Sequence, residues 1–145
     1  MRNLVSEQWI GYNDLKTTSV YFHATRKSAF SETGKTIPYE TLNINLGNAM
    51  VVGGTFTVPK NGTYSVAMTG LGMSGSTRVY LYVNGKSTEY SAFAINKFST
   101  YAMQGIVKLA AGDKVTTHLA EGSVGDGGGF TNTHFTGMLI EEDLA

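Results

Sequence analysis

The chain has 145 residues and a mass of 15.6 kDa, which fits one domain with a single hydrophobic core. Its 11 basic and 11 acidic residues cancel to a formal net charge of zero. This argues against a nucleic-acid or anionic-membrane partner, because both need a cationic excess. The absence of cysteine excludes disulfides, thiolate nucleophiles and cysteine zinc sites, and no apolar run is long enough to span a membrane.

Residues 1–17 are expected to form an N-terminal arm or stalk remnant ahead of a globular domain over residues 18–145. Val5, Trp9 and Tyr12 fall at a helical spacing, yet an extended arm is the simpler interpretation of so short a segment. The start of the chain lacks the apolar stretch of a secretory signal. We therefore expect either a protein that is not exported classically or a chain that begins after such a segment.

Short β-rich segments separated by Gly, Asn and Ser clusters recur roughly every ten residues, a spacing typical of an antiparallel sandwich or barrel. The segment Arg78–Asn84 alternates most clearly and predicts a strand with one buried face. Its apolar face holds Val79, Leu81 and Val83, and its other face holds Arg78, Tyr80 and Tyr82. The other expected strands are Ser19–Ala24, Ile37–Asn45, Gly54–Val58, Thr63–Thr69, Glu89–Ile95, Gly105–Leu109, Lys114–Ala120 and Thr133–Glu141.

Residues that favour tight turns separate these strands. Pro59-Lys60-Asn61-Gly62 and Asn84-Gly85 are two such turns. Asn61-Gly62-Thr63 is also a formal N-glycosylation sequon, although the Asn-Gly turn explains it equally well. Residues Gly125–Gly129 are expected to form a mobile loop before the last strand.

Two motifs suggest chemistry that their surroundings do not support. Residues Gly70–Gly75 match the G-x-G-x-x-G dinucleotide fingerprint, but that mechanism needs a helix to follow, and here a strand follows. His23, His118 and His134 have no second metal ligand at a short spacing, so we expect surface or interface positions for them. A G-x-S-x-G nucleophile elbow is absent. We therefore expect no cofactor, no metal site and no enzymatic activity.

Several segments, in their order and spacing, resemble the C1q-type globular domain over residues 19–141. They are Val20-Tyr21-Phe22-His23-Ala24, Tyr39 with Asn45, Phe56-Thr57-Val58-Pro59 with Gly62-Thr63-Tyr64, Val83-Asn84-Gly85, Val107-Lys108-Leu109 with Gly112-Asp113-Lys114-Val115, and Phe135-Thr136-Gly137-Met138-Leu139-Ile140. Met50, Val66 and Met68 stand where the family usually has aromatic residues. They remain apolar, so the core pattern is kept while its shape differs.

The resemblance implies a ten-stranded jelly-roll β-sandwich of the C1q and tumour necrosis factor shape, packed as a homotrimer and extracellular or surface-associated. It implies a lectin-like or pattern-recognition module for surface carbohydrate or microbial ligands, as in innate immunity. Two other functions stay open: a structural trimerisation head that caps a fibre, and a receptor-binding ligand like tumour necrosis factor. Calcium-binding members carry carboxylates where this chain has Ser76, Asn84 and Gly85, so calcium is not expected.

The outward face of strand Arg78–Asn84 is the candidate ligand-binding surface. Arg78, Tyr80 and Tyr82 share this face, and Lys86 follows closely along the chain. Tyrosine rings stack on the apolar faces of sugars, and arginine binds a carboxylate through two hydrogen bonds, which suits a neutral or acidic glycan. The structural alternative is that tyrosines stabilise the sheet by cross-strand pairing.

A second pattern supports the trimer. The expected strands carry more apolar surface than one small sandwich hides. The residues concerned are Tyr64, Val66 and Met68, which we expect near Phe135 and Leu139. The sequence alone does not separate those that face a neighbouring subunit from those that fill the core.

Overall fold

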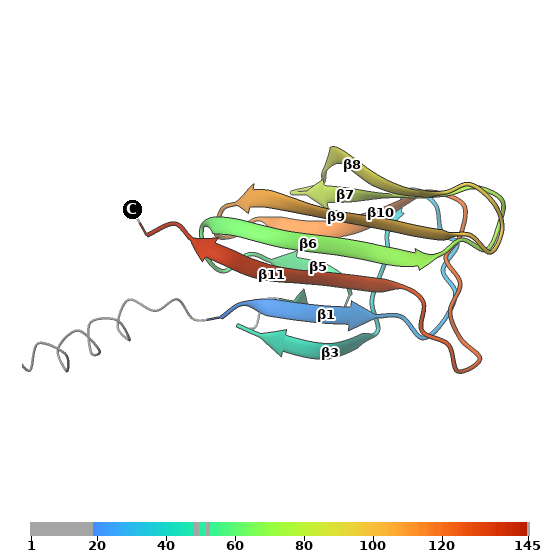
Figure 1. The fold of residues 1–145 in the computed structure, drawn as a ribbon, viewed down its shortest axis with the longest axis horizontal. Helices are drawn as coiled ribbons and strands as arrows, with labels where there is room; N and C mark the ends of the chain where they lie inside the picture. The colour runs from blue at the N-terminus through green and yellow to red at the C-terminus, as the bar shows by residue number, and fades with distance from the viewer. Residues whose placement is uncertain (1–18, 48–49, 52, 145) are drawn as a thin grey trace, which may run out of the picture.

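The computed structural model describes residues 19–47, 50–51 and 53–144, so the arm expected over residues 1–17 lies outside the described residues. Within the described part every regular element is a strand, and the strands form two antiparallel sheets packed face to face (Figure 1). This confirms the predicted all-β jelly-roll sandwich. The C-terminus and the start of the first strand lie at one end of the sandwich, at the left of Figure 1.

The first sheet has the strand order β3-β1-β11-β6-β9. Its strands are β1 (Tyr21–Thr25), β3 (Thr41–Leu46), β6 (Gly62–Leu71), β9 (Thr100–Leu109) and β11 (His134–Glu142). The second sheet has the path β4-β5-β10-β7-β8. Its strands are β4 (Met50–Val51), β5 (Thr55–Thr57), β7 (Thr77–Val83), β8 (Lys86–Ala94) and β10 (Lys114–Glu121). These two paths contain the ten strands expected, and the described residues add a short strand, β2 (Lys35–Thr36), paired with β10.

Strand β6 shows why this sequence forms a sandwich. Buried and half-buried residues alternate along its whole length, so one side of the strand faces the core and the other faces outward. Tyr64, Val66 and Met68 lie on the buried side, where Phe135 of β11 joins them. These residues, which we expected as indications of a trimer, therefore fill the core of a single subunit, and any assembly must use other surfaces.

A cluster of aromatic rings joins the two sheets. The Phe22 ring of β1 lies 4.7 Å from the Phe56 ring of the second sheet and 5.0 Å from the Phe135 ring, measured between centroids. The Phe56 ring in turn meets the Tyr64 ring edge to face at 5.7 Å. Such pairs stabilise a core by more than their buried area alone. This cluster forms the centre of the fold.

The segment before β3 differs from the sequence prediction. Residues Ile37–Glu40 were expected to be strand, yet β3 begins only at Thr41. Pro38 has no N–H to donate to a ladder, which explains why regular pairing stops there. Tyr39 nevertheless enters the core, and its hydroxyl is 2.8 Å from the Thr117 hydroxyl of β10.

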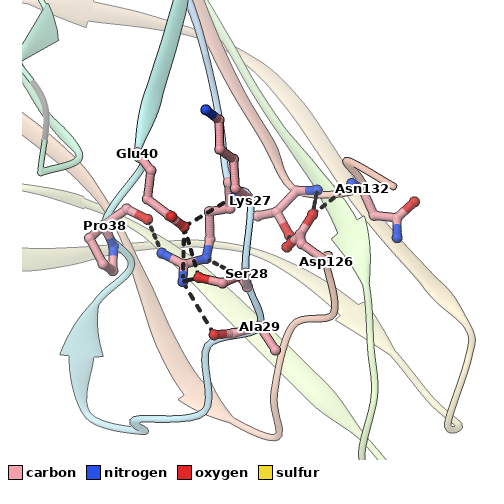
Figure 2. A network of polar contacts seen from close by, with 9 residues as sticks. Lys27, Ser28, Ala29, Pro38, Glu40, Asp126 and Asn132 are labelled. Atoms are coloured by element: carbon pink, nitrogen blue, oxygen red, sulfur yellow. Dashed lines mark hydrogen bonds and ion pairs between the residues drawn. The ribbon is translucent and has the colours of Figure 1, made fainter. Parts of the chain in front are cut away.

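The loops at the end of the sandwich opposite the C-terminus are tied together by a buried arginine that the sequence analysis did not single out. Arg26 follows β1, and its guanidinium donates hydrogen bonds to the carbonyl oxygens of Ser28, Ala29 and Pro38. Its side chain is 5% exposed and forms an ion pair with Glu40 at 3.4 Å. Figure 2 shows Pro38, Glu40 and Ser28 gathered at this point.

Asp126 organises the glycine-rich loop that was expected to be mobile. Its carboxylate accepts hydrogen bonds from the backbone N–H groups of Asn132 and Thr133 at 2.6 and 2.8 Å (Figure 2). Gly127 and Phe130 also exchange two backbone hydrogen bonds. The base of the loop is therefore held by specific contacts on both sides of its glycines.

Gly137 provides a direct test of the packing of β11. A Cβ atom at this position would lie 2.5 Å from the Phe22 ring, closer than real Cβ contacts allow. We expect Gly137→Ala to lower the free energy of unfolding by about 1–3 kcal/mol, because the ring must shift within a packed core. Urea denaturation will measure the change.

Gly105→Ala is the matched control for this variant. Gly105 lies in β9 of the same sheet, and the nearest heavy atom to a Cβ there is 3.7 Å away. This variant should be as stable as the parent or slightly more stable, since alanine restricts the unfolded chain. Equal losses at the two positions would contradict the packing argument.

Candidate binding surfaces

The outward side of β7 carries the tyrosines that the sequence predicted to face solvent. Val79 and Leu81 are fully buried, while Arg78, Tyr80 and Tyr82 are half-buried on the other side of the strand. Strand β7 lies between β10 and β8 in the second sheet, so these side chains stand in the middle of a sheet rather than at its edge. The predicted alternation therefore places all three on one outward face.

His118 of β10 belongs to the same surface, although the sequence analysis did not include it. Its Cα is paired with that of Tyr80, and its ring stacks on the Tyr82 ring at a centroid distance of 4.3 Å and an angle of 8°. One face of Tyr82 is thus covered. Burial lowers the pKa of His118, so the ring is neutral at physiological pH. We call Arg78, Tyr80, Tyr82 and His118 the tyrosine face.

Arg78 is engaged by neighbouring side chains. Its guanidinium carbon lies 4.4 Å from the centre of the Phe93 ring. It donates a hydrogen bond to the Ser91 hydroxyl at 2.9 Å, and its Nε is 3.8 Å from a Glu121 carboxylate oxygen. Glu121 therefore offsets part of the positive charge of Arg78.

Lys86 is not brought onto the tyrosine face. Its Cα is paired with that of Val83 across the β7–β8 hairpin. Directly opposed residues in an antiparallel pair direct their side chains to the same side of the sheet, and Val83 is out of phase with Tyr82. Of the four residues predicted for the ligand site, three therefore share a face and Lys86 leaves the sheet on the other side.

The outward face of the first sheet has a different character. Tyr21 of β1 is paired with Met138 of β11 on one side and with Leu46 of β3 on the other. All three are exposed, and Ile44 and Ile140 extend the same apolar surface. We call these five residues the assembly face. A contiguous apolar patch of this kind marks an interaction surface.

One edge of the sandwich is also apolar. Strands β8 and β9 are the last strands of the two sheets and lie next to each other, at the top of Figure 1. Tyr90 of β8 and Ile106 of β9 are exposed there, and Ile106 retains 65% of its accessible surface. Met103 and Gln104 complete a shallow hollow between these two side chains. We call Tyr90 and Ile106 the apolar edge.

Two histidines far apart in sequence meet beside the assembly face. His23 Nε2 and His134 Nδ1 are 2.8 Å apart, and the two rings are nearly parallel. Burial and the neighbouring His134 lower the pKa of His23. The sequence analysis expected surface or interface positions for the histidines but had no spacing signal for this pair, whose members are 111 residues apart.

The structure also bears on the rejected motifs. Gly70 and Leu71 end β6, and the remaining residues of the glycine motif lead into strand β7. Across residues 19–47, 50–51 and 53–144, no group of three His, Asp or Glu side chains could hold a metal ion. The same part of the chain contains no helix long and apolar enough to cross a membrane.

Two sheets in this strand order define a jelly roll of the C1q and tumour necrosis factor class. The family model of the C1q domain matches residues 21–140. The chain therefore belongs to the C1q domain family, whose domains are generally non-catalytic recognition modules. No curated protein sequence matches this chain.

Solved structures of both branches of this class are similar to the chain. The globular domain of zebrafish complement 1qA protein is 16% identical with a TM-score of 0.66, over 88% of this chain and 100% of that one. Murine APRIL is 12% identical with a TM-score of 0.65, over 84% and 99%. Eiger TNF from S. frugiperda is 13% identical with a TM-score of 0.60, over 88% and 95%. At such identities the likeness concerns the fold alone.

Calcium removal tests whether the turns at Asn84 and Asp113 hold a cation. Asn84 donates a hydrogen bond to the Asp113 carboxylate at 3.0 Å, and no further carboxylate joins them among the described residues. We expect a chelator to leave the melting temperature unchanged, because only a ligand bound to the folded state would stabilise it. A drop of several degrees that added calcium reverses would reveal a site built by carboxylates from several subunits.

Proposed function

We propose that the protein is a trimeric, non-catalytic recognition head that binds neutral surface carbohydrate, of microbial or cellular origin, through the tyrosine face. The observation that carries this proposal is the row of outward aromatic rings on β7 and β10, in the middle of a sheet. Tyr80 and the face of Tyr82 opposite His118 offer apolar surfaces on which a sugar ring would stack. Their hydroxyl groups provide hydrogen bonds beside these surfaces.

Trimer formation is supported by two apolar surfaces on different sides of one subunit. The apolar edge lies on β8 and β9, whereas the assembly face covers β3, β1 and β11. When the apolar edge of one subunit contacts the assembly face of the next, successive subunits are related by a rotation. A rotation of one third of a turn closes a ring of three subunits. C1q and tumour necrosis factor domains typically form trimers, which fits this arrangement.

A receptor-binding role is the second candidate, and one observation favours it. The loop that joins β8 to β9 exposes Ile95 and Phe98, and Phe93 precedes them on β8. Phe98 has a φ of 64°, an uncommon backbone conformation for a bulky residue. Exposed aromatic residues near an arginine are typical of the centres of protein interfaces. A protein receptor would use this loop, whereas a sugar would use Tyr80 and Tyr82.

The oligomeric state tests the assembly. Light scattering at micromolar concentration should give the mass of a trimer. Ile106→Glu should give a monomer, because it places a charge within the apolar contact. Phe130→Glu is the matched control, since Phe130 is equally exposed but lies in the glycine-rich loop, away from both apolar surfaces. A monomeric parent protein would overturn the proposed assembly.

Glycan binding tests the ligand surface. A screen of neutral and acidic glycans should identify neutral ligands, and the double variant Tyr80→Ala, Tyr82→Ala should weaken their binding at least thirtyfold, about 2 kcal/mol. Phe130→Ala removes an exposed aromatic ring outside the tyrosine face and should bind as the parent does. Unchanged affinity in a folded, trimeric double variant would exclude the tyrosine face. Failure of all glycans to bind would favour the receptor-binding role or a fibre cap.

A further inference from the structure

The paired histidines lie in the surface that the proposed trimer covers. His23 follows Tyr21 by two residues on β1, so both side chains leave the sheet on the same side. His23 is paired with Ile44 of β3 on one side and with Thr136 of β11 on the other. His134 lies two residues before Thr136 on β11 and is the diagonal neighbour of His23. The imidazoles thus continue the apolar row of Tyr21, Leu46 and Met138.

The hydrogen bonds of this pair fix where each proton lies. His134 Nε2 is 3.2 Å from the carbonyl oxygen of Thr131, and because a carbonyl only accepts, His134 carries its proton on Nε2. When His134 is neutral, its Nδ1 therefore accepts a hydrogen bond from His23 Nε2–H at 2.8 Å. Both rings are neutral in this arrangement. One added proton still allows a hydrogen bond between the two rings. A second added proton leaves N–H groups on both His23 Nε2 and His134 Nδ1, which then repel each other.

The carboxylates nearest to this pair are already engaged by other groups, and Glu141 and Glu142 lie at the far end of β11. The neighbouring strands contribute Ile44 from β3 and Thr69 from β6, and neither β1, β3 nor β6 contains a charged residue. The carboxylate of Asp126, in the preceding loop, is occupied by the N–H groups of Asn132 and Thr133. Two further charges lie nearby: the Arg26 guanidinium, which is turned into the subunit, and the Glu40 carboxylate, which forms an ion pair with it at 3.4 Å.

We propose that His23 and His134 make assembly of the trimer depend on pH, so that subunits associate when the pair is neutral and separate when it is protonated. This inference rests on the proposed function, because it requires that the assembly face is covered by a neighbouring subunit. A neutral hydrogen-bonded pair is compatible with an apolar interface. A charged pair without a counter-ion must keep its water, and it therefore opposes burial.

The sign of the effect follows from linkage. Burial and His134 already lower the pKa of His23 below its ordinary value of 6.5 in the isolated subunit. Covering the face lowers that pKa further, so the separated subunit binds more protons than the assembled one. The association constant is therefore highest above the pKa of His23 in the separated subunit, which is already below 6.5, and it falls as the pH drops below that pKa. One linked proton per subunit changes the association constant of a trimer by up to about a thousandfold per pH unit.

Light scattering across the range in which histidine titrates, from about pH 8 to about pH 5, tests the proposal. The parent protein should have a trimer mass at the upper end and a monomer mass at the lower end, with the near-UV circular dichroism of a folded chain at both. The double variant His23→Gln, His134→Asn keeps a donor and an acceptor in place without a titrating group. It should remain trimeric throughout. His118→Gln removes the histidine of the opposite sheet and should assemble with the pH dependence of the parent.

The outcomes distinguish failure of the proposed pH switch, formed by His23 and His134, from failure of the proposed trimer. A parent trimer that persists unchanged at about pH 5 would overturn the switch and leave the assembly intact. A monomer already at about pH 8 would overturn the assembly and, with it, the switch. An unaltered pH midpoint in the double variant would also overturn the role of the pair. The single variant His23→Gln provides the same comparison if the double variant does not fold, and its midpoint should shift to lower pH.

Discussion

The register of β1 against β11 depends on one close contact, the Phe22 ring lying over Gly137. The two residues are directly paired, and the missing side chain at Gly137 lets the ring lean across β11 to contact Phe135 and reach Phe56 of the second sheet. A slip of one residue would turn Phe22 outward and bring its polar neighbours into the core. The same register pairs Tyr21 with Met138 and places His23 diagonal to His134. The core contact thus determines the composition of the outer face.

The tyrosine face and the assembly face differ in the residue types that occupy the outward positions of their strands. On β7 the outward positions hold tyrosine and arginine, and these side chains satisfy one another through His118, Phe93 and Glu121. On β1 and β11 the outward positions include exposed apolar side chains, such as Tyr21 and Met138, beside the histidine pair. The tyrosine face is therefore suited to contact with water and polar ligands. Burial of the assembly face would release ordered water and lower the free energy of the system.

The fold followed from the sequence because its signals are local. The alternation along Arg78–Asn84 and the turn at Asn84-Gly85 specify a hairpin, and both turn residues have the positive φ that a two-residue hairpin turn requires. The predicted strand at Ile37–Asn45 was wrong at its start, since Pro38 breaks the ladder while Tyr39 still packs inward. Short strands such as β2 carry too few residues to show a period.

The contacts between distant segments could not be predicted in this way. The His23–His134 pair and the Tyr82–His118 stack depend on which strands lie side by side, and no residue spacing encodes that. Likewise, Tyr64, Val66 and Met68 were expected partly at a subunit interface, but they are buried in the core of one subunit. The sequence does not show how many apolar side chains the core of one sandwich holds. Lys86 is close to Tyr82 in sequence, yet it is paired with Val83, so its side chain lies on the opposite side of the sheet from Tyr82.

The position of the two faces on opposite sheets has a consequence for the proposed trimer. Assembly through the first sheet and the apolar edge would leave the tyrosine face of each subunit uncovered, so a trimer would carry three copies, one on each subunit. Each copy is a small, shallow contact around Tyr80 and Tyr82, and such sites bind single sugars weakly. A ligand long enough to reach more than one of these sites would bind far more tightly, because each further contact forms at high effective concentration. A pH change that separates the subunits would therefore release a multivalent ligand without altering any single binding site.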